Sequence, residues 1–315
     1  MRSPCPRAAC SRGKHRTGMA GAARYLDPAI VARLGTIDLK ARTIVEGFLT
    51  GLHRSPYKGF SVEFAEYRQY LPGDDLATLD WKVFARSDKH FVKKYEEETN
   101  LACHLLIDVS RSMGYGSGEI TKLQYASYLT GALAYLMHRQ RDSFGLIAFD
   151  DSISALLPAS ARSGHLRMVL LALERLKIGG ATNVSKPLHD LAAAVRKRGM
   201  VVLVSDLLDE PSSVLDGLKH FRYRGTDVIV FHILDPYELK FPFEQAARFR
   251  DMETQEEVMA VPGSVRADYI EKMQSLIAYY KRELGLAGID YCLLETSQPL
   301  ELGLMSYLMT RRRVL

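Results

Sequence analysis

Short unbroken runs of Val, Ile and Leu recur in the last two thirds of the chain, and stretches with helical spacing separate them. The clearest run is 201–204, and 105–107 and 228–231 are similar. A strand that is apolar on both faces must be covered on both faces, as a parallel strand is between two layers of helices. We therefore predict an α/β fold over residues 101–315, with a doubly wound, mainly parallel sheet flanked by helices.

Residues 26–100 have a different pattern and predict a small α+β unit that precedes this fold. Asp27 and Pro28 are an N-cap and a first-turn proline, which indicate the start of a helix. A second helix is expected at 37–49, and a loop rich in Gly, Ser and Pro at 51–58. Further expected elements are a strand near Val62 and Phe64, a short helix at 78–86 and a strand at 90–97.

Residues 1–25 have no pattern typical of a packed core, and we expect either a disordered leader or a mistaken start with Met19 as the true first residue. Five of the 42 Lys and Arg residues, and none of the 37 acidic residues, lie in the first 18 positions. The remainder of the chain is therefore electrically balanced. Without a general basic field, binding to nucleic acid is not expected.

The composition also argues against a membrane protein and against a disulfide-rich one. No stretch approaches the roughly 18 consecutive apolar residues that span a bilayer. The four cysteines include no Cys-x-x-Cys pair, so neither a zinc site nor a disulfide framework is indicated. Cys103 and Cys292 lie in apolar runs, where cysteine is normally a small buried hydrophobe. We expect a cytoplasmic protein.

A cluster of oxygen-bearing residues follows the first expected strand, 105–109. Asp108, Ser110 and Ser112 stand at alternate positions there. One carboxylate and two hydroxyls suit Mg²⁺, which prefers hard oxygen ligands and keeps several waters. The same spacing also occurs in ordinary loops, where Asp and Ser cap a helix or close a turn.

Two later segments favour the metal hypothesis. The loop 179–183 begins with two glycines and contains Thr182, and the buried-type strand 200–205 is followed by Asp206. In an open α/β sheet the loops at the carboxyl ends of the strands meet at one edge, so the three segments are expected to converge. Two carboxylates would leave bound Mg²⁺ near neutral and open to one more anionic oxygen.

At these residues the chain resembles the von Willebrand factor A domain with its metal-ion-dependent adhesion site. The resemblance implies that Ser110 and Ser112 bind the cation directly, and that Thr182 binds it directly or when ligand is present. Asp108 and Asp206 would act partly through waters. The cation would be Mg²⁺, or else Mn²⁺ or Ca²⁺, and a partner protein would offer it an Asp or Glu carboxylate. Residues expected to contact that partner are Arg111, Gly114 and Asn183.

A second set of segments forms a recognisable signature: 59–64, 66–75, 79–81, 85–86 and 92–98. In them the chain resembles the bacterial domain-of-unknown-function family fifty-eight, and the resemblance runs from about Leu26 to the C-terminus. It departs from the family pattern at Ala77, where an arginine is expected. The family resemblance implies a MoxR-type AAA ATPase as partner, and a role in the maturation or assembly of protein complexes.

Two functions follow. The first is a metal-dependent protein-interaction module, an adaptor or co-chaperone without catalytic residues. The alternative is a hydrolase in which the same cation activates water, and its base would be Asp206 or a residue of 61–98. We also expect a β-hairpin within 249–261, either a partner surface or structural decoration. The glycines of 114–118 lack the offset to Lys122 that a phosphate-binding Walker A loop needs, and they predict a flexible rim beside the metal.

Overall fold

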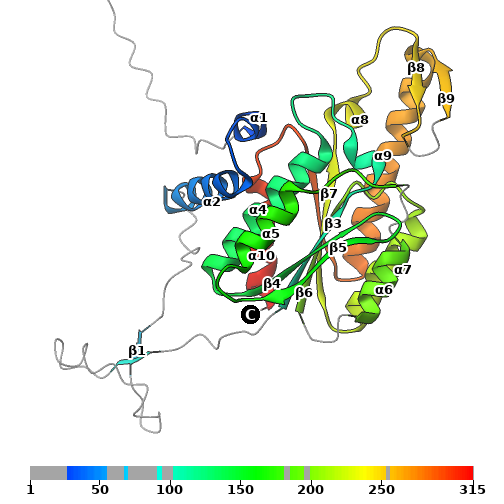
Figure 1. Ribbon diagram of the computed structural model, residues 1–315. Helices are drawn as coiled ribbons and strands as arrows, with labels where there is room; N and C mark the ends of the chain where they lie inside the picture. The colour runs from blue at the N-terminus through cyan, green and yellow to red at the C-terminus, as the bar shows by residue number, and fades with distance from the viewer. Residues whose placement is uncertain are drawn as a thin grey trace, which may run out of the picture.

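A six-stranded sheet forms the centre of the molecule, with the order β10-β7-β6-β3-β4-β5 (Figure 1). The structure, a computed structural model, describes residues 27–54, 67–69, 91–93, 102–180, 185–194, 199–252 and 256–314. Every neighbouring pair in the sheet is parallel except β4 and the edge strand β5. The strands are β3 (Ala102–Asp108), β4 (Ser143–Phe149), β5 (Ile153–Ser160), β6 (Gly199–Ser205), β7 (Asp227–Leu234) and β10 (Asp290–Glu295).

The apolar runs of the sequence are the inner strands, which confirms the predicted α/β fold with its mainly parallel sheet. Every residue of β6 is buried, as are all residues of β7 after Asp227. The edge strand β5 instead alternates between exposed and half-buried positions. This is the expected difference between a strand covered on both faces and a strand at an edge.

Helices cover both faces of the sheet, and each face has its own apolar core. On one face lie α4 (Lys122–Arg139), α5 (His165–Glu174) and α10 (Glu301–Val314) (Figure 1). On the other face lie α6 (Ser185–Ala194), α7 (Pro211–Tyr223) and α9 (Pro262–Leu286). The sheet is therefore doubly wound, as predicted.

Two N-terminal helices, α1 (Pro28–Ala32) and α2 (Ile37–Arg54), add an outer layer over α4. The Asp27 side chain accepts a hydrogen bond from the Ala29 N–H at 2.9 Å, which confirms the predicted N-cap. The loop expected at 51–58 is wrong for 51–54, because α2 continues to Arg54. Ile37, Ala41 and Ile44 of α2 are buried in the core shared with α4, so tertiary packing extends this helix past a glycine.

The rest of the N-terminal unit is described only at two short strands. β1 (Tyr67–Gln69) and β2 (Phe91–Lys93) pair in antiparallel fashion, and β2 lies within the strand expected at 90–97. The leader at 1–25, the strand near Val62 and the helix at 78–86 lie outside the described residues.

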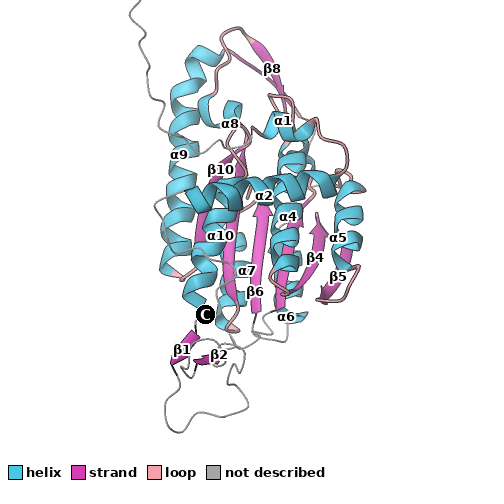
Figure 2. Cartoon of the chain, turned by 90° about the vertical axis from the view of Figure 1, so that its left-hand side faces the viewer, coloured by secondary structure: helices cyan, strands magenta, loops and turns pink. Residues whose placement is uncertain are grey.

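Between β7 and β10 the chain makes an excursion above the carboxyl edge of the sheet (Figure 2). It contains α8 (Pro236–Lys240) and the antiparallel hairpin of β8 (Ala247–Arg250) and β9 (Glu257–Ala260). The hairpin was expected from the sequence, whereas α8 and the 3-10 turn η2 (Arg111–Gly114) were not. None of the helices in the part of the chain that the structure describes is both long and apolar enough to span a bilayer.

Candidate functional site

The candidate site lies where β3 and β6 end side by side. The two strands are parallel neighbours in which Ile107 pairs with Val204, so Asp108 and Asp206 leave the sheet at the same edge. From this point the chain winds in opposite senses, because α4 follows β3 on one face and α7 follows β6 on the other. Such a reversal point is where open α/β sheets commonly bind ligands.

Asp108 is held by neutral donors. Its Oδ1 accepts the Ser110 N–H at 2.9 Å, and its Oδ2 accepts the Ser205 hydroxyl at 2.6 Å. The Oγ atoms of Ser110 and Ser112 are 3.0 Å apart, and Ser112 also forms a hydrogen bond with the Asp206 carboxylate. All of these side chains are buried. The structure therefore brings together four of the five predicted ligand residues.

Asp206 is held differently, by a buried cation. Lys122 Nζ lies 2.8 Å from Asp206 Oδ2 and 2.6 Å from Glu238 Oε1, and the Lys122 and Asp206 side chains have no exposed surface. The next residue, Leu207, has a φ of 52°, a left-handed conformation that costs a non-glycine residue about 1 to 3 kcal/mol. Its carbonyl accepts the Tyr280 hydroxyl at 3.1 Å, which holds this strained turn and therefore Asp206 in place.

Sequence reasoning missed Lys122 and Glu238 as parts of the site. Lys122 was considered only against the Walker A spacing, although it begins α4 directly after the loop that leaves β3. A helix that starts at this edge places its first side chains near the strand ends. Glu238 stands three positions after Asp235, and the two form a capping box at the start of α8. That spacing is a signal of a helix start that could have predicted α8 and a carboxylate at the same edge.

Burial and charge shift the pKa values of these groups. Burial, and then the nearby Asp206 carboxylate, raise the pKa of Asp108 to about 7. Burial acts to raise the pKa of Asp206 as well, but the Lys122 ammonium together with the hydrogen bonds from Lys122, Ser112 and Leu208 outweighs it and holds that pKa below its usual value. Burial raises the pKa of Glu238 by more than Lys122 lowers it. Burial alone would lower the pKa of Lys122, yet the two carboxylates hold it above its usual range. The ammonium is therefore charged.

The site is short of positive charge. Within the described residues Lys122 pairs with both Asp206 and Glu238, and Asp108 lies beside Asp206, so these four groups have a net charge of minus two when all are ionised. Buried charge without compensation is costly. The earlier expectation of two carboxylates near one cation therefore needs correction, because Glu238 adds a negative charge and Lys122 a positive one. With all three carboxylates ionised, two further positive charges would neutralise the cluster.

The donor set fits a hard cation only if the serines take part. Among the residues that the structure describes, no three or more His, Cys, Asp or Glu side chains are grouped so as to hold a metal ion. The hydroxyls of Ser110 and Ser112 add two neutral oxygens beside Asp108 and Asp206. Two carboxylates with neutral oxygens are chemistry that suits Mg²⁺.

The glycine-led loop approaches the same residues as far as it is described. The Gly179 N–H donates to the Val109 carbonyl at 2.7 Å, and the Arg111 N–H donates to the Gly180 carbonyl at 3.2 Å. Asp150 Oδ2 accepts the Gly180 N–H at 2.9 Å. A Cβ at Gly179 would lie 2.1 Å from this oxygen, which explains the glycine. Thr182 and Asn183 lie outside the described residues, so their expected roles stay predictions.

The two other residues expected to contact a partner lie on η2. Arg111 is exposed there. Gly114 is tightly packed, since a Cβ on it would lie 2.6 Å from Ile178 Cδ1 and 3.6 Å from Met252 Cε.

The expected flexible rim at 114–118 is wrong, because this loop is packed and hydrogen-bonded. Both the N–H and the hydroxyl of Ser117 donate to the buried Asp235 carboxylate, at 2.9 and 2.5 Å. A Cβ at Gly116 would lie 2.5 Å from the Ile120 carbonyl oxygen. The Lys122 N–H donates to the Tyr115 carbonyl at 2.8 Å. The loop therefore fixes the start of α4, and with it Lys122.

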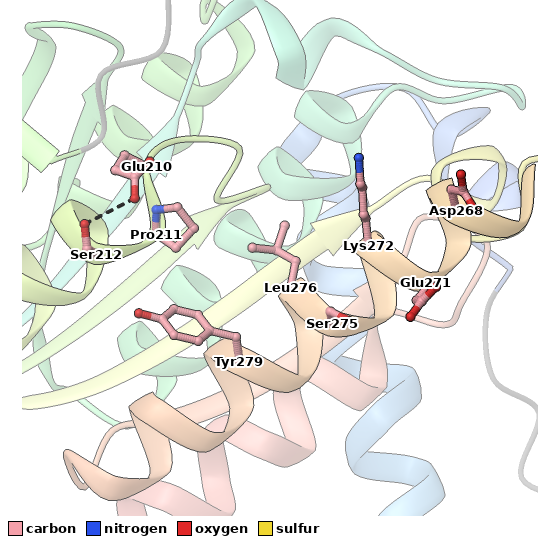
Figure 3. A pocket seen from close by; sticks show the side chains of 9 residues that line it. All are labelled: Glu210, Pro211, Ser212, Asp268, Glu271, Lys272, Ser275, Leu276 and Tyr279. Carbon is pink, nitrogen blue, oxygen red and sulfur yellow. Dashed lines mark hydrogen bonds between the residues drawn. The ribbon is translucent and has the colours of Figure 1, made fainter. Parts of the chain in front are cut away.

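A separate hollow of about 750 Å³ lies between the start of α7 and the side of α9 that faces it (Figure 3). Tyr279 and Leu276 face the turn that contains Pro211, and Lys272 and Asp268 continue the wall along α9. None of the predicted site residues that the structure describes lines it. Its size alone gives no reason to place the function there.

Comparison with known proteins gives distant relatives. The uncharacterized protein Rv1480 of Mycobacterium tuberculosis is 24% identical over 291 residues, which cover 91% of each chain. A conserved hypothetical protein, BatB from Bacteroides thetaiotaomicron, is 15% identical, with a TM-score of 0.47 over 67% of this chain and 99% of that one. The SpRpn10 VWA domain is 14% identical, with a TM-score of 0.37 over 65% of this chain and 94% of that one.

The family model described as "Protein of unknown function DUF58" matches residues 66–276, about two thirds of the chain. The matched segment includes the strand ends and helix starts that form the site, from Asp108 to Glu238. It also includes the hairpin of β8 and β9. The chain therefore belongs to the DUF58 family.

Proposed function

We propose that this protein is an interaction module that binds its partner through a divalent cation, with Mg²⁺ preferred over Mn²⁺ or Ca²⁺. Ser110 and Ser112 bind the cation directly, together with Thr182. Asp108 and Asp206 supply negative charge and orient waters. An Asp or Glu of the partner protein fills the remaining position, so the cation joins two proteins and catalyses no reaction.

The observation that carries the proposal is the charge deficit. Among the described residues Lys122 pairs with Asp206 and Glu238, Asp108 is held by neutral donors, and Asp108, Asp206 and Lys122 are buried. A divalent cation supplies the two missing charges at the point where the carboxylates meet. Its preferred ligands, carboxylate and hydroxyl oxygens, are the groups present.

The serine geometry supports the same conclusion. Neighbouring ligands of an octahedral Mg²⁺, each about 2.1 Å from the cation, lie roughly 3 Å apart. The Oγ atoms of Ser110 and Ser112 are 3.0 Å apart. This separation also suits a hydrogen bond between the hydroxyls, so little rearrangement separates the metal-free site from the loaded one.

Thr182 is included as a ligand because its neighbours in the chain lie next to the two serines. Gly180, two positions earlier, is hydrogen-bonded to the backbone of Arg111, between the two serines. The loop is thereby anchored next to the serines just before Thr182. The role of Thr182 itself rests on the resemblance to the adhesion site.

A MoxR-type AAA ATPase is the partner that we propose, with assembly or maturation of protein complexes as the process. This part rests on the family resemblance alone. The test is capture of a purified MoxR-type ATPase from the same organism by the full chain in MgCl₂ and in EDTA. Retention that is equal in both conditions, or unchanged in Asp108→Asn, contradicts it.

Calorimetry tests the metal site. MgCl₂ is titrated into the full chain after EDTA treatment and dialysis, and the wild type is expected to show a single saturable site. Ser112→Ala should weaken binding by about tenfold or more, because a direct ligand is lost. Ser275→Ala, which removes an exposed hydroxyl on α9, is the matched control and should bind like the wild type. Absence of saturable binding, or equal affinity in both variants, refutes the proposal.

A further inference from the structure

An aromatic hollow of about 670 Å³ opens beside the candidate site. Its wall includes Ser112, whose hydroxyl meets Ser110 and Asp206, and Glu238, which binds Lys122. The hollow therefore borders the proposed metal site from two sides. The rest of its lining is dominated by six aromatic residues, Tyr115, Tyr237, Phe241, Phe243, Phe249 and Tyr269.

Five of these rings, all except that of Tyr115, form one packed cluster that joins three separate elements. Phe241, at the end of α8, is the centre, and its ring centroid lies 4.6 Å from that of Tyr269 on α9. It lies 5.4 Å from Phe249 on β8 and 5.1 Å from Phe243 in the connection to β8. Aromatic pairs at such distances are favourable contacts. Contacts between the rings therefore hold the wall of the hollow together.

The hairpin of β8 and β9 ties the hollow to the metal-binding loop. Met252, two positions after the end of β8, lines the hollow, and its Cε is 3.6 Å from where a Cβ on Gly114 would lie. Figure 2 shows the hairpin beyond the carboxyl edge of the sheet, on the side where a partner bound to the cation would have to lie. A segment that reaches the cation therefore passes along the hollow.

The wall of the hollow has two arginines, Arg248 and Arg250, and two carboxylates, Glu238 and Asp251. Val258 and Met259 of β9 are 62% and 69% exposed, and as neighbours on a strand they add one apolar side chain to each face of the hairpin. Arg248 pairs with Glu257 at 3.1 Å, whereas exposed Arg250 has no acidic partner within the described part of the chain. Exposed apolar surface next to a pocket is typical of a protein-binding site. The unpaired guanidinium favours an acidic partner.

We propose that the aromatic hollow binds a bulky apolar side chain from an acidic segment of a partner protein. The Asp or Glu next to that side chain binds the metal, and a second acidic residue pairs with Arg250. The partner motif therefore combines an acidic residue with an aromatic or large aliphatic one a few positions away. This inference rests on the proposed function, because the acidic residue needs the cation.

A library of random seven-residue peptides displayed on phage tests the inference. It is selected on the full chain in MgCl₂ and, separately, in EDTA. In MgCl₂ we expect enriched sequences that hold an Asp or Glu within three positions of Phe, Tyr, Trp, Leu or Met. A synthetic copy of the most enriched peptide should bind about tenfold more weakly when its acid becomes the amide, and also about tenfold more weakly when its bulky residue becomes Ala.

Two arginine variants test the proposed contact between Arg250, at the edge of the aromatic hollow, and an acidic residue of the partner. Arg250→Glu should weaken the synthetic peptide about fivefold or more, because the change reverses a charge at the rim. Arg162→Glu reverses an exposed charge after β5, at the opposite end of the sheet from the site, and should leave affinity unchanged. Equal effects of the two variants would overturn the rim contact. Thermal unfolding of both variants checks that each is folded.

The remaining outcomes separate the two proposals. Enriched peptides that need Mg²⁺ and an acid but no bulky residue support the proposed function and overturn this inference. If peptides with a bulky apolar residue are enriched equally in MgCl₂ and in EDTA, the hollow binds apolar side chains without the cation. That result contradicts the metal-dependent function. No enrichment in either condition overturns the inference. If sedimentation shows a dimer of the chain that the peptide dissociates, the occupant of the hollow is a second copy of the chain. That result overturns the assignment to another protein.

Discussion

Two hollows of similar volume differ in what lies beside them. The hollow between α7 and α9, about 750 Å³, is lined by Asp268, Glu271 and Lys272 with a few apolar side chains, and its charges point into solvent. The aromatic hollow, about 670 Å³, adjoins a buried cluster of carboxylates, an ammonium and two serines. A functional site is therefore indicated by buried polar groups whose charge is not fully balanced by neighbouring groups. Volume alone does not identify it.

The largest expected effect comes from removing a lysine beside each hollow. Lys122→Met leaves Asp206 and Glu238 buried without a cation, and we expect a loss of about 3 to 5 kcal/mol in the free energy of unfolding. Lys272→Met removes an exposed charge on α9 and should change it by less than about 0.5 kcal/mol. Urea denaturation in EDTA measures both. Similar losses would mean that the two hollows do not differ in buried charge.

Acidification should also remove the stabilising contribution of His232, which lies under the site. Burial lowers the pKa of His232 to about 4, and its neutral ring is held between the Asp206 carbonyl at 2.8 Å and the Tyr291 hydroxyl at 2.7 Å. The unfolded chain takes up this proton below about pH 6.5, and the folded chain only near pH 4, so the His232 contribution to the free energy of unfolding should fall between these values by up to about 3 kcal/mol. Asp108, whose pKa is raised to about 7, takes up its proton in the folded state first and acts in the opposite direction over the same range.

The measurement is urea denaturation in EDTA at a series of pH values from 7 to 4. His232→Gln, which keeps a polar side chain but does not titrate, should gain stability relative to the wild type as the pH falls. A variant that loses stability as steeply as the wild type would show that other groups cause the acid sensitivity.

A smaller effect is expected in the loop between η2 and α4. Gly116→Ala places a Cβ 2.5 Å from the Ile120 carbonyl oxygen and 2.9 Å from Thr121 Cα, so the backbone must move. We expect a loss of about 1 to 3 kcal/mol in the free energy of unfolding. Gly118→Ala meets no atom within 4 Å and should be close to neutral. If thermal unfolding gave the same result for both, the loop would be the flexible rim that the glycines suggested.

The smallest effect is expected at the ion pair beside the aromatic hollow. Glu257→Gln breaks the exposed Arg248–Glu257 pair and should change the free energy of unfolding by less than about 1 kcal/mol. It also frees Arg248 for an acidic ligand, so the acidic peptide from the selection should bind about twofold more tightly in fluorescence polarisation. Weaker binding would show that Glu257 belongs to the contact surface.

The parts of the fold that depend on neighbouring residues were predictable from the sequence. Buried strands such as β6 have no alternation of polar and apolar residues, and Asp27 with Pro28 indicates a helix start from two adjacent side chains. Asp108 and Asp206 could be placed at one edge because each directly follows a parallel strand. These predictions need only local pattern and the geometry of α/β sheets.

The parts that depend on distant contacts were not predictable. Lys122 and Glu238 are 116 positions apart, and nothing in either local sequence indicates that they share a buried ion pair. The extension of α2 to Arg54 depends on packing against α4. In each case tertiary contacts decided what local preference left open.

The central claim is that Ser110 and Ser112 hold a divalent cation next to Asp108 and Asp206. Crystals of the full chain grown in EDTA and then soaked in MnCl₂ test it directly, through the anomalous scattering of manganese. We predict one strong peak within bonding distance of both serine Oγ atoms. Density that shows the two hydroxyls bonded only to each other, with no peak between the strand ends at saturating manganese, would contradict the claim.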